Sequence, residues 1–430
     1  MPFDFSRLRR FPDVEAPNLQ AWDATDELLV RWALDAGIPG EQIAVIGDEY
    51  GAITLALADA GLRGLRVHQD LVTGRRALAN NAAALGVAYR ITDAAGPDRR
   101  VDAGHAVESG GHPESGTALR SHELGETLLQ GARLVLLQLP KALAELEEIA
   151  DAVARWAAPD VTLIAGGRVK HMTLAQNEVL ARFFGSVQPQ RAERKSRLIR
   201  ASEPHAVSVE PPFPVSQTHD GLILCAFGGA FAGARLDIGT RVLRDALPQL
   251  SAGFGSQLRR SGAERAETTA SEPVGGQFSG VVNGSRLRVI DLGCGTGALA
   301  VAFALQNPQA LVTATDRSAS AVRSARATMA ANGLEGRVQV TLDDAGSELP
   351  AASADLILLN PPFHLGASVH EGAGRRLIQA VARLLKPGGE VWTVFNSHLD
   401  HRRILSRDVG STEQVVRTPK FTVTRSIRRG

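Results

Sequence analysis

Short apolar runs without polar–apolar alternation recur through the C-terminal half of the chain. Such runs are typical of strands buried on both faces of a sheet. Segments with helical character separate them. The predicted order is strand 288–292, helix 298–306, strand 311–315, helix 318–332, strand 338–342, strand 355–359, helix 374–385 and strand 390–395. This alternation predicts an α/β fold with a doubly wound parallel sheet.

The N-terminal half repeats this pattern in the same order. Its predicted elements are strand 42–46, helix 52–60, strand 65–69, strand 132–139, helix 143–157 and strand 161–165. The interval from Gly51 to Asp70 has the same length as the interval from Gly297 to Asp316, and each aspartate follows the second strand of its half. We interpret the halves as two copies of one unit; the alternative is a coincidental similarity between two α/β domains.

A chain of 430 residues is expected to form two or three domains. We predict a first domain at residues 1–205 and a second at 206–430. Segments 94–116 and 251–283 contain few large apolar residues, so they are predicted to be loops. The second of these is predicted to be a flexible insertion in the C-terminal domain.

A glycine-rich turn follows the first strand of the C-terminal copy. Asp291 lies in the strand, and Gly293, Gly295 and Gly297 follow in the turn that opens a helix. Glycines let a ligand approach bare backbone at the carboxyl edge of a parallel sheet. Asp316, at the end of the next strand, can accept hydrogen bonds from both hydroxyls of a ribose. The pattern predicts a nucleoside-containing cofactor.

The glycine spacing is tighter than the Gly-x-Gly-x-x-Gly pattern of NAD sites, so S-adenosylmethionine is favoured over NAD. In that interpretation Asp291 lies near the methionine ammonium, directly or through water. Asp344, after the third strand, accepts a hydrogen bond from the adenine amino group. The alternative for Asp344 is a turn or a helix cap beside Asp343.

The strand at 355–359 ends in Asn360-Pro361-Pro362-Phe363. The two prolines end the strand and restrict the backbone. The Asn360 side-chain oxygen and the Pro361 carbonyl can accept the two hydrogens of an amine on a planar ring, and the Phe363 ring can stack on that ring. The tetrapeptide therefore predicts a site for an amino group on a flat base; the alternative is a strand that merely ends in a turn.

The N-terminal copy lacks these features. Glu49 stands where the C-terminal copy has Gly295, and Gln138-Leu139-Pro140-Lys141 stands in place of the Asn-Pro-Pro-Phe sequence. We interpret the first copy as a unit that kept the fold and lost the chemistry, with a role in substrate binding or support.

The net charge of +1 does not indicate a nucleic-acid partner, but two segments of the chain are basic. Residues 401–430 contain eight Lys or Arg and two Asp or Glu, and a second cluster lies at 191–200. Such patches suit phosphate backbones, although a solvated basic face is an equal alternative. The residues of the second cluster are Arg191, Arg194, Lys195, Arg197 and Arg200.

The sequence also bears on the cellular location of the protein and on its association with other molecules. The first residues contain no apolar stretch of the kind found in secretion signals, and no apolar run approaches the ~20 residues that span a bilayer. The two cysteines, Cys225 and Cys294, define neither a disulfide framework nor a metal site. We expect a cytoplasmic monomer without a metal or a membrane partner.

The chain resembles the bacterial ribosomal RNA guanine-(2-amino)-methyltransferases, in which a degenerate N-terminal methyltransferase-like domain precedes an active one. The motifs that carry the resemblance are 236–241 (Leu-Asp-Ile-Gly-Thr-Arg), 291–297, 360–364 and 396–399 (Asn-Ser-His-Leu). The N-terminal half is more similar to the large-subunit methyltransferase G type than to the small-subunit methyltransferase C type. The resemblance implies two tandem Rossmann-like class I methyltransferase domains, S-adenosylmethionine as cofactor and ribosomal RNA as substrate.

By that resemblance, segment 236–241 caps the cofactor pocket; Asp237 and Arg241 could instead form a local ion pair. The expected reaction is methylation of a guanosine 2-amino group, in 23S rather than 16S ribosomal RNA. Two other functions stay open: methylation of a protein glutamine side chain, and a non-catalytic role in RNA binding or ribosome assembly.

Overall fold

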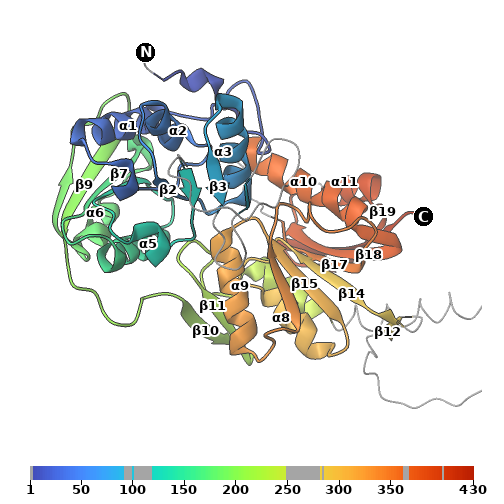
Figure 1. Ribbon diagram of the computed structural model, residues 1–430. Coiled ribbons are helices and arrows are strands. Elements are labelled where there is room, and N and C mark those ends of the chain that lie inside the picture. The colour runs from blue at the N-terminus through green and yellow to red at the C-terminus, as the bar shows by residue number, and fades with distance from the viewer. Residues whose placement is uncertain are drawn as a thin grey trace, which may run out of the picture. The chain divides into compact units, whose positions relative to one another are not determined.

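The computed structural model describes residues 3–91, 99–100, 119–247, 281–282, 285–361, 368–399 and 401–430. The chain divides into two compact units (Figure 1). Unit 1 comprises Met1–Phe213 with Phe227–Gly229, and unit 2 comprises Pro214–Ala226 with Ala230–Gly430. Most of the two predicted loops, 94–116 and 251–283, lies outside the described residues.

Unit 1 contains a nine-stranded mixed sheet with helices on both faces. Its strands are β1 (Ile43–Ile46), β2 (Leu65–His68), β3 (Tyr89–Ile91), β4 (Arg99–Arg100), β5 (Leu119–Ser121), β6 (Leu134–Gln138), β7 (Thr162–Arg168), β8 (Phe184–Pro189) and β9 (Ser196–Pro204). Its helices are α1 (Ala24–Ala36), α2 (Ala52–Asp59), α3 (Val72–Leu85), α4 (Glu126–Leu129), α5 (Leu143–Trp156) and α6 (Leu174–Ala181), with 3-10 turns at Phe5–Arg7, Gly40–Gln42 and Val169–His171.

Unit 2 contains a seven-stranded sheet and two small two-stranded ones. The large sheet consists of β14 (Arg288–Leu292), β15 (Leu311–Asp316), β16 (Val338–Leu342), β17 (Ala354–Leu359), β18 (Leu385–Asn396), β19 (Gly410–Arg417) and β20 (Phe421–Arg428). The pairs are β10 (Val215–His219) with β11 (Leu222–Ala226), and β12 (Val281–Val282) with β13 (Ser285–Arg286). The helices are 238–247, α8 (Ala298–Gln306), α9 (Ala319–Ala331), α10 (Ser368–Leu384) and α11 (His401–Asp408).

The two large sheets share one topology over seven strands. Unit 2 has the order β16-β15-β14-β17-β18-β20-β19, and unit 1 has β5-β2-β1-β6-β7-β9-β8, with β3 and β4 added beyond β5. In both, the last two strands are antiparallel to their neighbours. This equivalence agrees with the duplication inferred from the sequence. The prediction of a parallel sheet is correct for the central strands and misses this antiparallel edge.

Each sheet is buried on both faces, which explains the apolar runs that lack alternation. In β14, Val289 packs in a core with α8, α9 and the helix at 238–247, whereas Ile290 faces α10 and α11. In β1, Val45 faces α1, α2 and α3, and Ala44 faces α4, α5 and α6. Strand ends on the carboxyl side are therefore the places where polar side chains collect in both units.

Candidate active site

The turn between β14 and α8 carries the three predicted cofactor glycines, and each has a positive φ: 76° at Gly293, 54° at Gly295 and 79° at Gly297. Their surroundings differ. A Cβ on Gly297 would lie 2.8 Å from the Met329 Cε atom, so close packing of α8 on α9 requires this glycine. A Cβ on Gly295 would meet no atom within 4 Å. The turn is therefore open at Gly295, where a ligand can approach the backbone.

Unit 1 keeps the packing glycine and loses the open one. A Cβ on Gly51 would lie 2.5 Å from Leu78 Cδ1, so this glycine has the same packing role as Gly297. Glu49 occupies the place of Gly295, and its exposed side chain adds a carboxyl group to the turn that is bare in unit 2. The contrast supports assigning the open face at Gly295 to ligand binding rather than to folding.

Asp291 is almost fully buried, with 2% exposure, and its carboxylate accepts a hydrogen bond of 2.9 Å from the Ala300 amide in the first turn of α8. Burial raises the pKa of this carboxyl to about 7, and the charge of Asp316 acts in the same direction, while the Ala300 hydrogen bond opposes it. The structure thus ties Asp291 to α8; its contact with a methionine ammonium remains a prediction.

Asp316 links the glycine turn to the next helix. Its Oδ2 accepts a hydrogen bond from the Gly295 amide at 2.9 Å, and its Oδ1 accepts one from the Ser318 amide at 3.0 Å. Ser318 is the N-cap of α9, as the sequence predicts. The Asp316 carboxylate therefore lies beside the open face of Gly295, and its contact with a ribose hydroxyl remains a prediction.

The two acids after β16 have different partners. Asp343, with 2% exposure, accepts hydrogen bonds from the Ser347 hydroxyl and the Glu348 amide, so it serves as the local cap. Asp344 forms an ion pair of 2.6 Å with Arg376 of α10. The cap considered for Asp344 is thus formed by its neighbour, and the predicted adenine contact of Asp344 remains a prediction.

Asn360 follows β17, and its amide is fixed by two acceptors. The Nδ2 atom donates to Asp237 Oδ2 at 3.1 Å and to Thr240 Oγ1 at 2.8 Å, whereas the Oδ1 atom is buried and has no hydrogen-bond partner among the described residues. Pro361 is buried, and Pro362 and Phe363 lie outside the described residues. The free oxygen is the predicted acceptor for a substrate amine.

Segment 236–241 therefore contacts Asn360, although the sequence did not indicate such a contact. Asp237 also accepts a hydrogen bond of 3.1 Å from the Thr240 amide, as an N-cap does at the start of the helix at 238–247. Within the part of the chain that the structure describes, Asp237 forms no ion pair with Arg241, so that alternative is wrong; the Arg241 amide donates to the Asp237 carbonyl instead.

Phe421 was also missed from the sequence. It begins β20 and pairs in register with Asn396 of β18. A Cβ built on Gly239 would lie 3.2 Å from Phe421 Cε1 and 3.4 Å from Asn360 Oδ1, so the ring edge and the amide oxygen both border the space beside Gly239. The 396–399 motif gave a partial signal, because Phe421 lies opposite its first residue.

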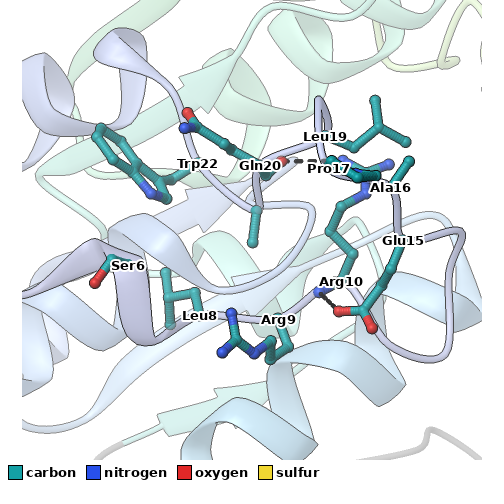
Figure 2. A pocket seen from close by; sticks show the side chains of 11 residues that line it. Ser6, Leu8, Arg9, Arg10, Glu15, Ala16, Pro17, Leu19, Gln20 and Trp22 are labelled. Atoms are coloured by element: carbon teal, nitrogen blue, oxygen red, sulfur yellow. Dashed lines mark hydrogen bonds between the residues drawn. The ribbon is translucent and has the colours of Figure 1, made fainter.

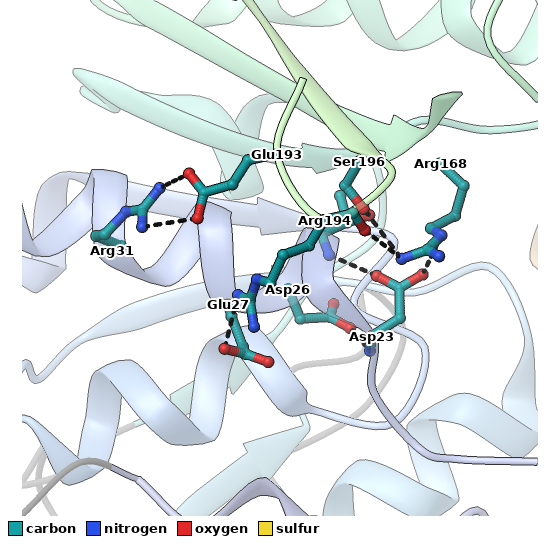
Figure 3. Close-up of polar contacts among 9 residues, drawn as sticks. Asp23, Asp26, Glu27, Arg31, Arg168, Glu193, Arg194 and Ser196 are labelled. Atoms are coloured by element: carbon teal, nitrogen blue, oxygen red, sulfur yellow. Dashed lines mark hydrogen bonds and ion pairs between the residues drawn. The ribbon is translucent and has the colours of Figure 1, made fainter. Parts of the chain in front are cut away.

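The equivalent amide of unit 1 is paired differently. Gln138 Nε2 donates to Asp26 Oδ1 at 2.5 Å, and Asp26 also accepts a hydrogen bond from the Asp23 amide at the start of α1 (Figure 3). Burial raises the pKa of Asp26 to about 8, and the charge of Asp48 adds to this effect. At neutral pH this carboxyl is therefore largely protonated.

The basic cluster at 191–200 is partly neutralised. Arg194 pairs with Glu27 at 2.7 Å, and Arg31 of α1 pairs with Glu193 at 2.6 Å (Figure 3). In the C-terminal cluster, Arg425 is held between Glu390 and Glu413. These ion pairs make the positive charge of the two clusters smaller than the sequence count indicates.

Two hollows lie in the N-terminal segment of unit 1, with volumes of about 570 and 800 Å³. Trp22 lines both. Arg10 is part of the wall of the smaller one, and its guanidinium donates to the Gln20 carbonyl (Figure 2). It also donates to the Val14 carbonyl. Arg10 also lies over the Tyr50 ring at 4.4 Å. Its side chain holds this segment together, and we assign the hollow no chemistry.

Two kinds of feature are absent from the described residues. No group of three His, Cys, Asp or Glu side chains there could hold a metal ion. Within the same residues, no helix is long and apolar enough to cross a bilayer.

Both halves of the chain match models of known protein families. The RLMG N-terminal domain model matches residues 1–99 and 112–205, and the methyltransferase small domain model matches 281–425. The ribosomal RNA large subunit methyltransferase G of Streptomyces avermitilis is 30% identical over 441 residues, which cover 100% of this chain and 98% of the relative. The protein of that name from Ectopseudomonas mendocina is 31% identical over 425 residues, covering 98% and 97%.

The chain is also similar in fold to a solved structure over nearly its whole length. The T. thermophilus 16S rRNA N2 G1207 methyltransferase, in complex with AdoMet and guanosine, aligns over 97% of both chains with a TM-score of 0.66. The sequence identity is 18%, so this likeness concerns the fold.

Proposed function

The chain belongs to the ribosomal RNA large subunit methyltransferase G family, and on that premise we propose that it methylates the 2-amino group of a guanosine in large-subunit ribosomal RNA. It is a class I methyltransferase that acts on ribosomal RNA and uses S-adenosylmethionine. The choice of guanine, of its 2-amino group and of 23S RNA is the proposed part. A reaction on ribosomal RNA implies a cytoplasmic location.

The observation that carries the proposal is the Asn360 Oδ1 atom at the end of β17, which is buried and has no hydrogen-bond partner among the described residues. A buried polar atom without a partner costs roughly 1–3 kcal/mol, so a native protein tolerates it where a ligand supplies the missing bond. The atom is an acceptor, and both hydrogens of its own amide group are already engaged. It therefore suits a donor such as an exocyclic amine.

The residues of the glycine turn fit the cofactor. Gly295 leaves the backbone open, Asp316 offers carboxylate oxygens beside it, and Asp291 and Asp344 provide further negative charge at the same sheet edge. We propose these four residues, with Gly293 beside Gly295, as the cofactor site. Gly297 supports that site through packing. S-adenosylmethionine, when bound, supplies an electrophilic methyl group.

The amine nitrogen of guanine is a poor nucleophile because its lone pair is delocalised into the ring. In this proposal Asn360 and the Pro361 carbonyl accept its hydrogens and orient the nitrogen lone pair. Phe363, which lies outside the described residues, is the stacking partner predicted from the sequence. Positioning of this kind is worth roughly 7–11 kcal/mol in well-oriented reactions. The nitrogen gains the methyl group, the bonding pair stays on sulfur, and the nitrogen then loses one proton to water.

The decisive experiment follows the label from S-adenosylmethionine into ribosomal RNA. Nucleoside digests should contain methylated guanosine from 23S RNA and none from 16S RNA. Asn360→Ala should abolish the product, while calorimetry shows unchanged cofactor affinity. The matched control is Gln414→Ala, which removes an exposed amide on β19 of the same unit.

Each part of the proposal has its own contrary result. Methyl transfer at the normal rate by Asn360→Ala would refute the role of Asn360. Label in adenosine, in cytidine or in a protein glutamine would refute the substrate. Cofactor uptake without any transfer would favour a binding or assembly role.

A further inference from the structure

The amide of Asn360 is held in one orientation by chemistry as well as by geometry. Amide oxygen and nitrogen have similar shapes, so an isolated asparagine can present either end. An ionised carboxylate only accepts hydrogen bonds, so the NH₂ group must face Asp237. Thr240 takes the second hydrogen. The oxygen is left as the only end that can face a substrate.

The first turn of the helix at 238–247 keeps Asp237 suited to this task. The Thr240 amide donates to the same carboxylate oxygen that Asn360 contacts, at 3.1 Å. A carboxylate at a helix N-terminus is also stabilised by the helix dipole. One oxygen of Asp237 thus accepts from both the Thr240 amide and the Asn360 side chain.

Gly239 leaves space in front of the amide oxygen. Its Cβ would lie 3.1 Å from Asp237 Oδ2 and 3.4 Å from Asn360 Oδ1. Gly239 lies inside the helix and is absent from the residues with positive φ, so the backbone does not require glycine there. The missing side chain matters instead for access to the oxygen.

We propose that Asp237 and Thr240 are positioning residues that fix Asn360 with its oxygen towards the substrate amine, and that Gly239 keeps this oxygen accessible. The inference rests on the proposed function, because it assigns a cause to the orientation of the proposed amine acceptor. Three residues from one helical turn thus act on a side chain more than 100 positions away in the sequence.

The contact between Gln138 and Asp26 in unit 1 shows which alternative the test must exclude. There Gln138 donates to Asp26, which lies in the first turn of α1. Unit 1 makes this contact although its glycine turn carries Glu49. A helix-to-amide contact can therefore contribute to folding alone. The experiment must separate the orientation of the amide from the stability of the unit.

The test compares substitutions that keep or remove the acceptors. Thr240→Ser keeps a hydroxyl and should retain kcat within about twofold, whereas Thr240→Val should lower kcat by about 10-fold or more. Asp237→Asn can present either end of its own amide to Asn360 and should lower kcat by about 10- to 100-fold. Gly239→Ala should lower kcat about 10-fold.

The readouts are kcat with saturating labelled S-adenosylmethionine and large-subunit RNA, cofactor affinity by calorimetry, and Tm. Cofactor affinity should stay within about twofold of the original protein in all variants. A purely structural role would instead lower Tm and cofactor affinity together with kcat.

Two outcomes separate this inference from the proposed function. If Asn360→Ala is inactive while Thr240→Val, Asp237→Asn and Gly239→Ala keep normal kcat, Asn360 retains its role and the positioning inference is refuted. If Asn360→Ala itself is active, the proposed role of Asn360 fails first.

Discussion

At the scale of single residues, the carboxyl of Asp291 is buried and belongs to the proposed site of a cationic cofactor. Its pKa is raised to about 7, so its charge is only half developed near neutral pH. The carboxyl stabilises the fold most when protonated, and this contribution is lost as the pH rises from 3.8 towards 7. Cofactor binding, in contrast, gains from the ionised form.

We therefore predict that S-adenosylmethionine binds up to about tenfold more tightly at about pH 8 than at about pH 6, as Asp291 ionises. Asp291→Asn should bind more weakly at high pH and lose this dependence on pH. Calorimetric titrations of both proteins across this range give the answer, since the titration of the cofactor's own amine is common to both. An equally steep dependence in Asp291→Asn would rule out Asp291 as its source.

The sequence offered Asn360, Asp291 and Asp316 as candidates because strand-end acids and an amide after an apolar run are local patterns. It could not identify the partners of Asn360, since Asp237 and Thr240 belong to a different helix and only folding brings them to the amide. Gly297 shows the converse case. The spacing assigned it to the cofactor, which stays a prediction, and gave no sign of its packing against Met329.

At the scale of elements, the turn from β8 to β9 is a two-residue hairpin loop with non-glycine residues in the left-handed region. Arg194 has φ of 48° and Lys195 has φ of 63°, and Glu193 and Ser196 exchange two backbone hydrogen bonds of 2.8 Å around them. Hairpin loops of this type favour glycine, because a side chain in this region costs roughly 1–2 kcal/mol.

Lys195→Gly should stabilise unit 1 by about 0.5–1 kcal/mol, since relief of this strain exceeds the entropy cost of glycine. The Arg194–Glu27 ion pair is untouched. Thermal unfolding should show Tm higher by about 2–4 °C. Lys170→Gly, at an exposed site without positive φ, is the matched control and should lower Tm. A lower Tm in Lys195→Gly would contradict the strain argument.

The central strands of both sheets were predictable because burial on both faces leaves an apolar run in the sequence. The antiparallel edge strands were not, as β20 illustrates. Its buried face contains Thr422, Thr424 and Ser426. Hydroxyl side chains in a strand give no apolar run, so a hydrophobic pattern cannot detect such a strand even when it is buried.

At the scale of the whole molecule, the charge available to RNA is that of basic residues without an ion pair among the described residues. Arg417 and Lys420 flank the turn before Phe421, both are exposed, and among the described residues neither forms an ion pair. The Lys420 carbonyl accepts a hydrogen bond of 2.9 Å from the Ser397 amide. These two charges therefore lie at the turn between β19 and β20. Phe421, the first residue of β20, borders the same space beside Gly239 as the Asn360 oxygen.

Replacing Arg417 and Lys420 by Gln should weaken RNA binding and lower the slope of log K against log salt by roughly 1.5–2, since each charge releases about one counterion. Filter-binding titrations over a range of salt concentrations measure this slope. Arg407→Gln is the control, because Arg407 is already paired with Asp408, and it should leave the slope nearly unchanged. Equal slopes for all three proteins would place the RNA contact elsewhere.

The buried carboxylate of Asp48 has a consequence for anyone who would engineer a second catalytic centre into unit 1. Asp48 accepts from the Thr54 amide in the first turn of α2, the same task that Asp291 performs for Ala300. In unit 1 the acid comes from the turn, and Val45 stands in the strand. Introducing Val45→Asp alone would bring two carboxylates to one amide. A working redesign must remove the acid at 48 and the bulk at Glu49 in the same step, so no single substitution leads back to an active first copy.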